Sequence, residues 1–261
     1  MYQHHSESID RVRAYFQDIP AVQGLLLGGS IAHGFETPSS DIDIMIVVSD
    51  EEHQQRMQAG TIQFFSCELC TYPEGYVDGK YASTGFMRQV AASGSEPARF
   101  AYADAQVLFA RSDGVEALAR QIARYPIEHK AARMRSFFAQ FEGWNWYVSE
   151  ALRLKNAYLL GVSISKLILF GGRLILAHNE MLYPYHKWFL RVLEGAPDKP
   201  VDLLPRIHAL TQEPTEANTR AFFDCVRDFR VWETSAHGWP SQFMLDSELT
   251  WMDDKTAVDD L

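Results

Sequence analysis

Residues 25–48 read LLLGGSIAHGFETPSSDIDIMIVV, and this stretch decides the fold. The apolar run Leu25 to Leu27 ends abruptly in Gly28-Gly29-Ser30, which predicts a strand that breaks into a turn. Residues 31–40 hold a glycine, a proline and two serines, so they predict at most a short helix followed by a loop. From Asp41 to Val48, isoleucines alternate with other residues, which is the period of a strand. The segment therefore predicts two strands joined by a glycine-serine turn and a loop.

Two carboxylates stand at the start of the second strand. Asp41 and Asp43 are separated by one residue, so both project from the same face of a strand. Their charges repel each other, and a divalent cation that both carboxylates bind offsets that repulsion. Gly28 and Gly29 have no Cβ, so the backbone there can approach a phosphate, and the Ser30 hydroxyl can donate to it. The pattern predicts a site for magnesium and phosphate.

Mixed helical and strand patterns surround this stretch in the first half of the chain. Apolar residues at helical spacing predict an amphipathic helix over Ser6 to Asp18, and a polar segment predicts an exposed helix over Asp50 to Gln58. Thr61 to Thr71 predicts a strand, and turn residues after it predict that Tyr76 to Ser83 pairs back as a hairpin. Gln106 to Ala110 predicts one more strand.

The second half of the chain has helical periodicity throughout. Apolar residues recur at spacings of three and four from Met134 to Leu159, and further helices are predicted over Ser163 to His178, Tyr185 to Leu193 and Thr215 to Trp232. The fold class expected is α+β. A mixed sheet with flanking helices, the expected catalytic domain, occupies residues 1–120, and an all-helical domain, expected to bind substrate, follows over residues 121–261.

The spacing of the glycine-serine turn and the two aspartates resembles a known signature. Gly29, Ser30, Asp41 and Asp43, with Ser40 before the first aspartate, are similar to the motif of the nucleotidyltransferase superfamily with the DNA polymerase beta-type catalytic fold. The resemblance covers roughly residues 20–110. It is strongest to small bacterial members, among them the aminoglycoside nucleotidyltransferases, which append a helical domain to the catalytic one.

The resemblance implies a third carboxylate on a later strand, and the chain offers two candidates. Asp78 lies in the segment that we expect to pair as a hairpin strand, where Lys80 shares its face and is suited to phosphate. Glu68 lies in the preceding segment. We favour Asp78 as the third catalytic and metal-binding carboxylate, with Glu68 as its alternative.

The implied function is a metal-dependent nucleotidyltransferase that moves a nucleoside monophosphate from an NTP to a hydroxyl and releases pyrophosphate. The acceptor would be a small molecule, antibiotics included, or a protein. Asp41, Asp43 and Asp78 would be catalytic and would hold two Mg²⁺ ions. The residues expected to bind the NTP are Gly28, Gly29, Ser30, Lys80 and Arg99. Two alternatives stay open: a nucleotide-sensing or antitoxin-like binding protein with the same fold and little turnover, and an enzyme that modifies nucleic-acid ends.

Charge and motif content narrow the function classes. The 261 residues carry 24 lysines and arginines against 34 acidic residues, a formal net charge of -10. Binding a long nucleic acid needs a clustered basic surface, so such a polymer is not expected as the main partner. The sequence has neither the glycine-lysine phosphate loop of many kinases and ATPases nor the glycine fingerprint of dehydrogenases.

Cysteine content and hydropathy indicate a cytoplasmic chain. Three cysteines are too few for a disulfide framework, and the chain starts on a polar segment. Cys67 and Cys70, if they lie on a strand, face opposite sides and are structural residues. The most apolar stretch, Tyr158 to Ala177, is interrupted by Lys166 and Arg173, which favours a buried helix over a membrane span. The apolar helical stripe could be covered within one chain or across a homodimer.

Overall fold

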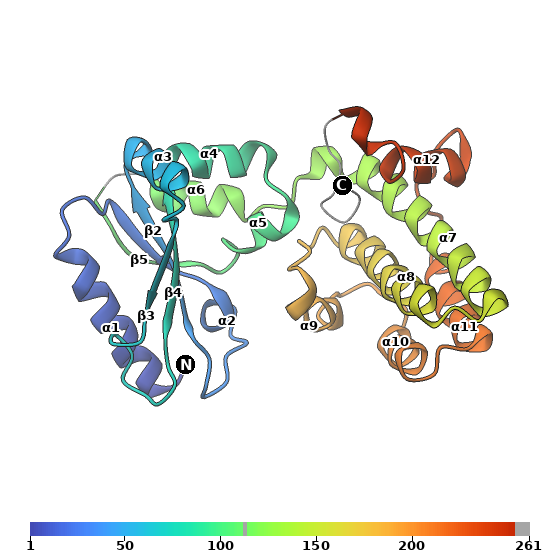
Figure 1. Ribbon diagram of the computed structural model, residues 1–261, viewed down its shortest axis with the longest axis horizontal. Coiled ribbons are helices and arrows are strands. Elements are labelled where there is room, and N and C mark those ends of the chain that lie inside the picture. Colours follow the sequence, from blue (N-terminus) through green and yellow to red (C-terminus); the bar gives the residue numbers. More distant parts are fainter. Residues whose placement is uncertain (112–113, 254–261) are drawn as a thin grey trace. The chain divides into compact units, whose positions relative to one another are not determined.

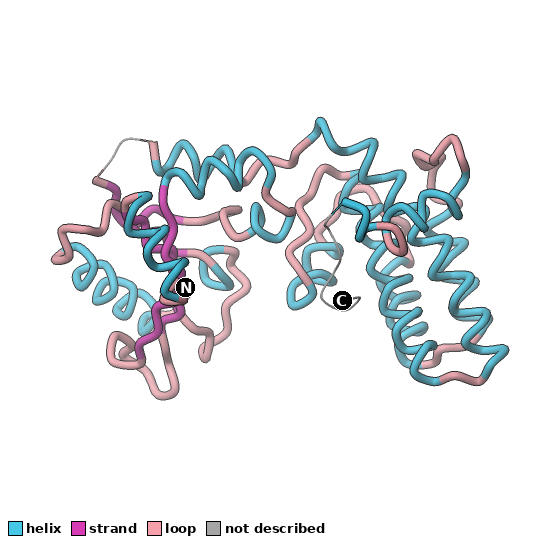
Figure 2. Tube along the Cα trace, turned by 45° about the horizontal axis from the view of Figure 1, so that its top comes forward, coloured by secondary structure: helices cyan, strands magenta, loops and turns pink. Residues whose placement is uncertain are grey.

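The computed structural model describes residues 1–111 and 114–253, and the chain divides into two compact units. The first unit spans Met1–Arg124 and the second Tyr125–Leu261. Strands occur only in the first unit of the described chain, as Figure 2 shows. Figure 1 labels the elements of both units. A boundary between independently folding domains at residues 120 and 121 stays a prediction.

A five-stranded mixed sheet organises the first unit, with the order β3-β4-β2-β1-β5. The strands are β1 (Gly24–Leu27), β2 (Ile42–Val48), β3 (Gln63–Ser66), β4 (Val77–Ser83) and β5 (Gln106–Ala110). β2 and β4 run parallel, and every other pair in the sheet is antiparallel. Together with the helices, this sheet confirms the predicted α+β class.

Successive side chains of β2 point to opposite faces of the sheet, and each face is covered by helices. The isoleucines of β2 pack with Val12 and Phe16 of α1 (Gln3–Gln17), and both of these side chains are fully buried. Met45 and Val47 point to the other face, where they pack with residues of α4 and α6. Figure 1 shows these helices around the sheet. Asp43 shares the parity of Met45, so it belongs to the second face.

Short helices lie between the strands of the first unit and after its last strand. They are α2 (Gly29–Ala32), α3 (Asp50–Ala59), α4 (Thr84–Ser93), α5 (Glu96–Phe100) and α6 (Val115–Ile122). Ser49, Ser83 and Ser95 cap α3, α4 and α5, since each hydroxyl accepts a backbone N–H three residues on. The sequence analysis predicted α3 but not α4 or α5, although a capping serine precedes each of these helices.

The strand predicted over Thr61 to Thr71 is shorter in the structure. β3 ends at Ser66, and a hydrogen-bonded turn follows in which the Cys70 N–H donates to the Cys67 carbonyl at 3.4 Å. The prediction that Cys67 and Cys70 lie on opposite faces of a strand is therefore wrong. The hairpin is confirmed, because β3 and β4 pair antiparallel with Gln63 opposite Lys80.

The second unit is helical over its described residues. Its elements are η1 (Ile127–His129), α7 (Lys130–Leu154), α8 (Ala157–His178), η2 (His186–Trp188), α9 (Phe189–Glu194), α10 (Leu203–Gln212), α11 (Glu216–Arg227), α12 (Gly238–Asp246) and η3 (Thr250–Asp253). The predicted periodicity from Met134 to Leu159 spans two helices rather than one. Lys155 adopts the left-handed conformation that ends α7, and the Asn156 side chain caps α8.

Aromatic side chains fill the core between these helices. α7 packs along α8, and α11 packs on both. Phe141 stacks on Phe223 at 4.8 Å between ring centroids and meets the edge of Phe222 at 6.1 Å. Gly171 of α8 faces this cluster: a Cβ there would lie 2.8 Å from Phe222 and 2.9 Å from Phe141. The close approach of α8 to the phenylalanines therefore requires a residue without a side chain.

Within the described residues, α8 is a helix long and apolar enough to span a membrane by length and composition. Core helices pass the same test, and 44% of its most apolar window is buried inside the protein. Lys166 and Arg173 lie within it, as the sequence analysis noted. Location in the cell and the absence of a membrane contact stay predictions.

Two glycines of α8 give a matched pair for testing this packing. Gly161→Ala should stabilise the second unit by about 0.5–1 kcal/mol, because Gly161 is exposed in a helix and no described atom lies within 4 Å of its added Cβ. Gly171→Ala should instead destabilise it by about 1–3 kcal/mol through overpacking. All six tryptophans lie in the second unit, so urea unfolding followed by tryptophan fluorescence reports on it. Equal shifts of the two variants would contradict this account of the core.

Candidate active site

The glycine-serine turn is fitted to Asp43. The Gly28 N–H donates to the Asp43 carbonyl at 2.9 Å. Gly29 has φ +61, and a Cβ added to it would lie 1.7 Å from Oδ2 of Asp43. The Asp43 carboxylate therefore occupies the space that any other side chain at position 29 would fill. Glycine is required here both for the backbone angle and for the approach of the carboxylate.

The parallel pairing of β2 and β4 brings a second carboxylate beside the first. Asp43 lies directly opposite Asp78 in the register of these strands, so both side chains project from one face of the sheet. Nε2 of Gln63 on β3 donates to Oδ1 of Asp78 at 2.9 Å. The structure thus brings together two of the three predicted carboxylates, and a neighbouring strand orients the second.

Tyr76 connects all three predicted carboxylates. The charge of Asp41 is the largest cause that raises the pKa of the Tyr76 hydroxyl, followed by burial and by a hydrogen bond with Asp41. The charges of Asp43 and Asp78 raise this pKa further. One phenol therefore lies close to Asp41, Asp43 and Asp78. The sequence analysis did not identify Tyr76, because its place next to Asp41 depends on the parallel pairing of β2 with β4.

Lys80 places a positive charge on the same face of the sheet. It lies opposite Met45 in the register, two residues beyond Asp78. Burial lowers the pKa of its ammonium, and the charge of Asp43 opposes this shift. The ammonium also lies 5.9 Å from the ring centroid of Tyr102, a buried residue. The Lys80 ammonium is therefore next to the Asp43 carboxylate and above the Tyr102 ring.

Ser30 follows the glycine turn and carries a buried hydroxyl. The residue is 4% exposed, and its Oγ has no hydrogen-bond partner among the described residues. A buried hydroxyl without a partner costs about 1–3 kcal/mol in proteins. A ligand with an acceptor oxygen would satisfy it.

The turn before β4 holds the backbone on both sides of Asp41. The Tyr72 hydroxyl donates to the Ser40 carbonyl at 2.6 Å. The Ile42 N–H donates to the Tyr76 carbonyl at 3.0 Å. The Tyr72 ring also covers Gly75, where an added Cβ would lie 2.6 Å from the ring. The segment from Tyr72 to Tyr76 therefore positions Asp41, another role that the sequence analysis did not predict.

The carboxylates do not form a preassembled metal centre. Among residues 1–111 and 114–253, no three His, Cys, Asp or Glu side chains lie close enough together to hold a metal ion. Magnesium is commonly held by one or two carboxylates together with waters and substrate phosphates. The Asp43 and Asp78 pair, with Asp41 nearby, fits such a shared coordination sphere. Magnesium binding by these residues stays a prediction.

The alternative third carboxylate, Glu68, lies elsewhere. It is exposed in the turn that follows β3, beyond the end of the sheet pairing. Asp78 is paired with Asp43, so the structure favours Asp78 over Glu68.

Arg99 is not brought to the site. It is 4% exposed, and its guanidinium donates to the carbonyls of Gly94, Ile122 and Ala91 at 3.1, 3.4 and 2.7 Å. These carbonyls lie at the C-terminal ends of α4 and α6, where backbone acceptors lack helical partners. The expectation that Arg99 binds a triphosphate is therefore corrected, because its donors hold two helix ends together.

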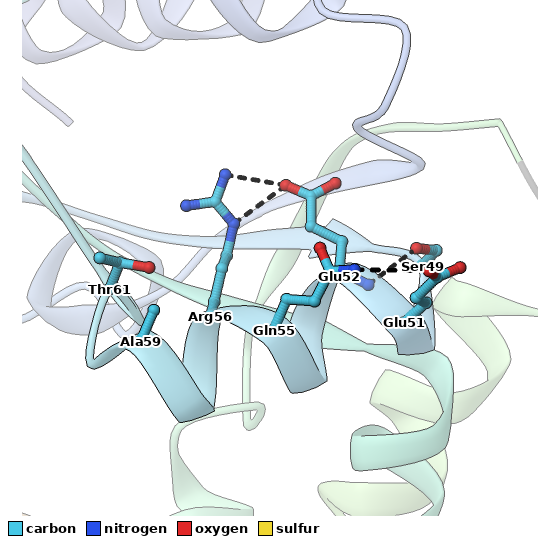
Figure 3. A pocket seen from close by; sticks show the side chains of 7 residues that line it. All are labelled: Ser49, Glu51, Glu52, Gln55, Arg56, Ala59 and Thr61. Carbon is cyan, nitrogen blue, oxygen red and sulfur yellow. Dashed lines mark hydrogen bonds and ion pairs between the residues drawn. The ribbon is translucent and has the colours of Figure 1, made fainter.

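A hollow over α3 is separate from this site. Figure 3 shows its lining, in which Nε and Nη2 of Arg56 donate to Oε1 of Glu52 at 2.9 and 2.8 Å. The Arg56 guanidinium also lies 3.6 Å from the Tyr81 ring centroid. Ser49 lines this hollow and directly follows the end of β2, whereas Asp41 directly precedes the start of β2. The hollow and the carboxylates therefore lie at opposite ends of one strand.

Part of the chain resembles a known protein family. Residues 9–83 match the family model described as Nucleotidyltransferase domain. The solved structure of a nucleotidyltransferase-like protein from Exiguobacterium sibiricum 255-15 is similar, with a TM-score of 0.48 and 12% sequence identity over 98% of this chain and 83% of that one. No curated protein matched the sequence. The matched residues run from within α1 to the end of β4 and include the glycine turn, the three aspartates and Lys80.

Gly29→Ala tests the fit between the turn and Asp43. The matched control is Gly60→Ala, since Gly60 also has a left-handed backbone (φ +69) but no described atom within 4 Å of an added Cβ. Both variants should lose about 1–2 kcal/mol from backbone strain. Gly29→Ala should lose about 1–3 kcal/mol more, because the methyl group displaces Asp43. Scanning calorimetry measures the two losses, and equal losses would refute the fit.

Arg99→Lys tests the corrected role of Arg99. A single ammonium cannot reach three carbonyls as the guanidinium does, so the variant should be less stable by about 1–3 kcal/mol. Its affinity for magnesium nucleotide should equal that of the wild type in titration calorimetry. A selective loss of nucleotide affinity with unchanged stability would restore Arg99 to the binding site.

Proposed function

We propose that this protein transfers a nucleoside monophosphate from an NTP to an acceptor hydroxyl, with release of pyrophosphate. The observation that carries the proposal is the Asp43 carboxylate, which lies in the space left by Gly29 and opposite Asp78. This arrangement joins a phosphate-binding turn to a cation-binding pair of carboxylates. The nucleotidyltransferase domain match over residues 9–83 supports the same reaction class.

The donor set fits two Mg²⁺ ions bound together with a triphosphate. Asp41, Asp43 and Asp78 would hold the ions, and Tyr76 and Gln63 would orient these carboxylates. Bound magnesium would supply neutralisation of the phosphate charge and a lowered pKa for the acceptor hydroxyl. The three proposed ligands, Asp41, Asp43 and Asp78, all offer carboxylate oxygens, which magnesium prefers.

The remaining residues bind the triphosphate. Gly28 and Gly29 would let the backbone approach it, and the Ser30 hydroxyl would donate to a phosphate oxygen. The Lys80 ammonium would add positive charge as pyrophosphate separates. The acceptor oxygen forms a bond to the α-phosphorus, the bond to the bridging oxygen breaks, and the hydroxyl proton leaves to solvent or to a base. Positioning and charge neutralisation lower the barrier.

The negative net charge of the protein favours some classes of acceptor over others. A net charge of -10 and the carboxylates at the site disfavour a polyanionic acceptor. We therefore propose a small molecule or a protein side chain as the acceptor, in keeping with the sequence analysis. Adenylylation by ATP or transfer from another NTP would use the same residues.

Carboxylate variants test this function. The protein is incubated with each NTP, magnesium and a panel of hydroxyl acceptors while pyrophosphate release is followed. Asp43→Asn and Asp78→Asn should each lower the rate by about a hundredfold or more, because each removes charge from the cation site. Glu68→Gln is the matched control and should keep the wild-type rate. Activity undiminished in the double variant Asp41→Asn with Asp43→Asn would refute the assignment.

A further inference from the structure

Two cysteines stand at the two ends of the turn that follows β3. Cys67 opens this turn and Cys70 closes it, through a hydrogen bond of 3.4 Å between the Cys70 N–H and the Cys67 carbonyl. A turn of this kind brings the Cα atoms of its first and fourth residues within about 7 Å. Disulfides usually span Cα separations of about 4.4–6.8 Å. Both cysteines are free thiols, so the turn places them at a distance that a disulfide can bridge.

The two thiols differ in environment as an attacking and a resolving cysteine do. Cys67 is exposed, whereas Cys70 is half-buried against the core of the first unit. Burial raises the pKa of the Cys70 thiol, hydrogen bonds with Tyr72 and Ser8 oppose this shift, and the charges of Cys67 and Asp41 add to it. An oxidant in solution would therefore meet Cys67 first, with Cys70 behind it.

Cys70 is also connected to the candidate active site. It lies two residues before Tyr72, whose hydroxyl donates to the Ser40 carbonyl at 2.6 Å. The next residue, Thr71, is anchored to α1, because its N–H donates to Oγ of Ser8 at 3.0 Å. A displacement of the Cys70 sulfur would thus act on the short segment that holds the backbone next to Asp41.

We propose that Cys67 and Cys70 form a reversible intramolecular disulfide that weakens nucleotide binding by releasing Ser40 from Tyr72. The modification site stands on the turn geometry alone. Its effect on nucleotide binding rests on the proposed function of Asp41.

The oxidation is a pair of thiol–disulfide exchanges with a glutathione-type disulfide. The Cys67 thiol loses its proton, and its sulfur attacks one sulfur of the small disulfide, which releases the first glutathione thiol. The Cys70 thiol then loses its proton and attacks the Cys67 sulfur of the mixed disulfide, which releases the second glutathione thiol. The two protein thiols are oxidised by two electrons, and one glutathione disulfide is reduced to two thiols. Excess reduced glutathione reverses both steps.

Cys225 is an internal control. It lies in the second unit, where burial raises the pKa of its thiol to about 11. Its Sγ lies 3.5 Å from Oδ1 of Asp202. Oxidation should therefore leave Cys225 as a thiol while the pair in the first unit is consumed.

The experiment treats the full chain with oxidised glutathione, alkylates the remaining thiols and digests the protein with trypsin. One peptide, residues 57–80, carries both Cys67 and Cys70, because no lysine or arginine lies between its ends. We expect this peptide to be two hydrogens lighter and unalkylated, and the Cys225 peptide to be alkylated. Recovery of alkylated Cys67 and Cys70, or a stable glutathione adduct on Cys67, would overturn the proposed disulfide.

The coupling is measured by calorimetry with a non-hydrolysable NTP and Mn²⁺, and by hydrogen exchange. Oxidised protein should bind the nucleotide several-fold more weakly than reduced protein, and residues 37–42 should exchange faster. Cys67→Ser should bind like the reduced wild type with or without oxidant, and Tyr72→Phe should bind more weakly even when reduced. Equal affinity and equal exchange in both redox states would overturn the coupling. If reduced protein binds no nucleotide, the proposed function fails instead. The peptide masses and the hydrogen exchange of residues 37–42 still test the disulfide in that case.

Discussion

The position of the Asp43 carboxylate beside Gly29 is the constraint on which the rest of the site depends. Residue 29 has a left-handed backbone, and the carboxylate fills the space of its missing side chain. The Gly28 N–H is also bonded to the Asp43 carbonyl. Main chain and side chain of Asp43 thus fix the turn in place. The Ser30 hydroxyl, next in the chain after this turn, has no hydrogen-bond partner among the described residues.

The pairing of β2 with β4 is a second constraint, and unlike the first it destabilises the sheet. It places Asp43 against Asp78, and like charges directly opposite each other destabilise a sheet. Gln63 donates a hydrogen bond to Asp78, and the Tyr76 hydroxyl forms a hydrogen bond with Asp41. Lys80 lies two residues after Asp78 on β4. These neutral donors and one cation offset part of the repulsion between the carboxylates. Three carboxylates near one phenol are not explained by stability alone, since apolar or oppositely charged pairs would make a more stable sheet.

The local patterns of the sequence predicted the parts of this arrangement but not all of their relations. The alternation of β2, the hairpin of β3 with β4 and the shared face of Asp41 and Asp43 follow from a period of two, which a sequence displays directly. The parallel pairing of β2 with β4 joins segments about 35 residues apart through a crossover, and no local pattern specifies such a contact. Tyr76 and Tyr72 were missed for this reason. Arg99 was misassigned because a lone arginine near a helix start looks the same in sequence whether its guanidinium meets a phosphate or three carbonyls.

The sequence also failed to predict where β3 ends and the chain turns. β3 ends at Ser66 although the following residues are apolar enough for a strand, because the Cys67 to Cys70 turn satisfies the backbone locally. That turn ends the pairing with β4 at Ser66 and puts both cysteines just beyond the end of the strand. The segment that positions Asp41 begins two residues after this turn. A change in the turn would therefore act on Asp41 through the Tyr72–Ser40 and Ile42–Tyr76 hydrogen bonds. In this unit the sheet fixes Asp43 and Asp78, whereas a turn fixes Asp41. The three carboxylates are therefore held by two different kinds of structure, strand pairing for Asp43 and Asp78 and a hydrogen-bonded turn for Asp41.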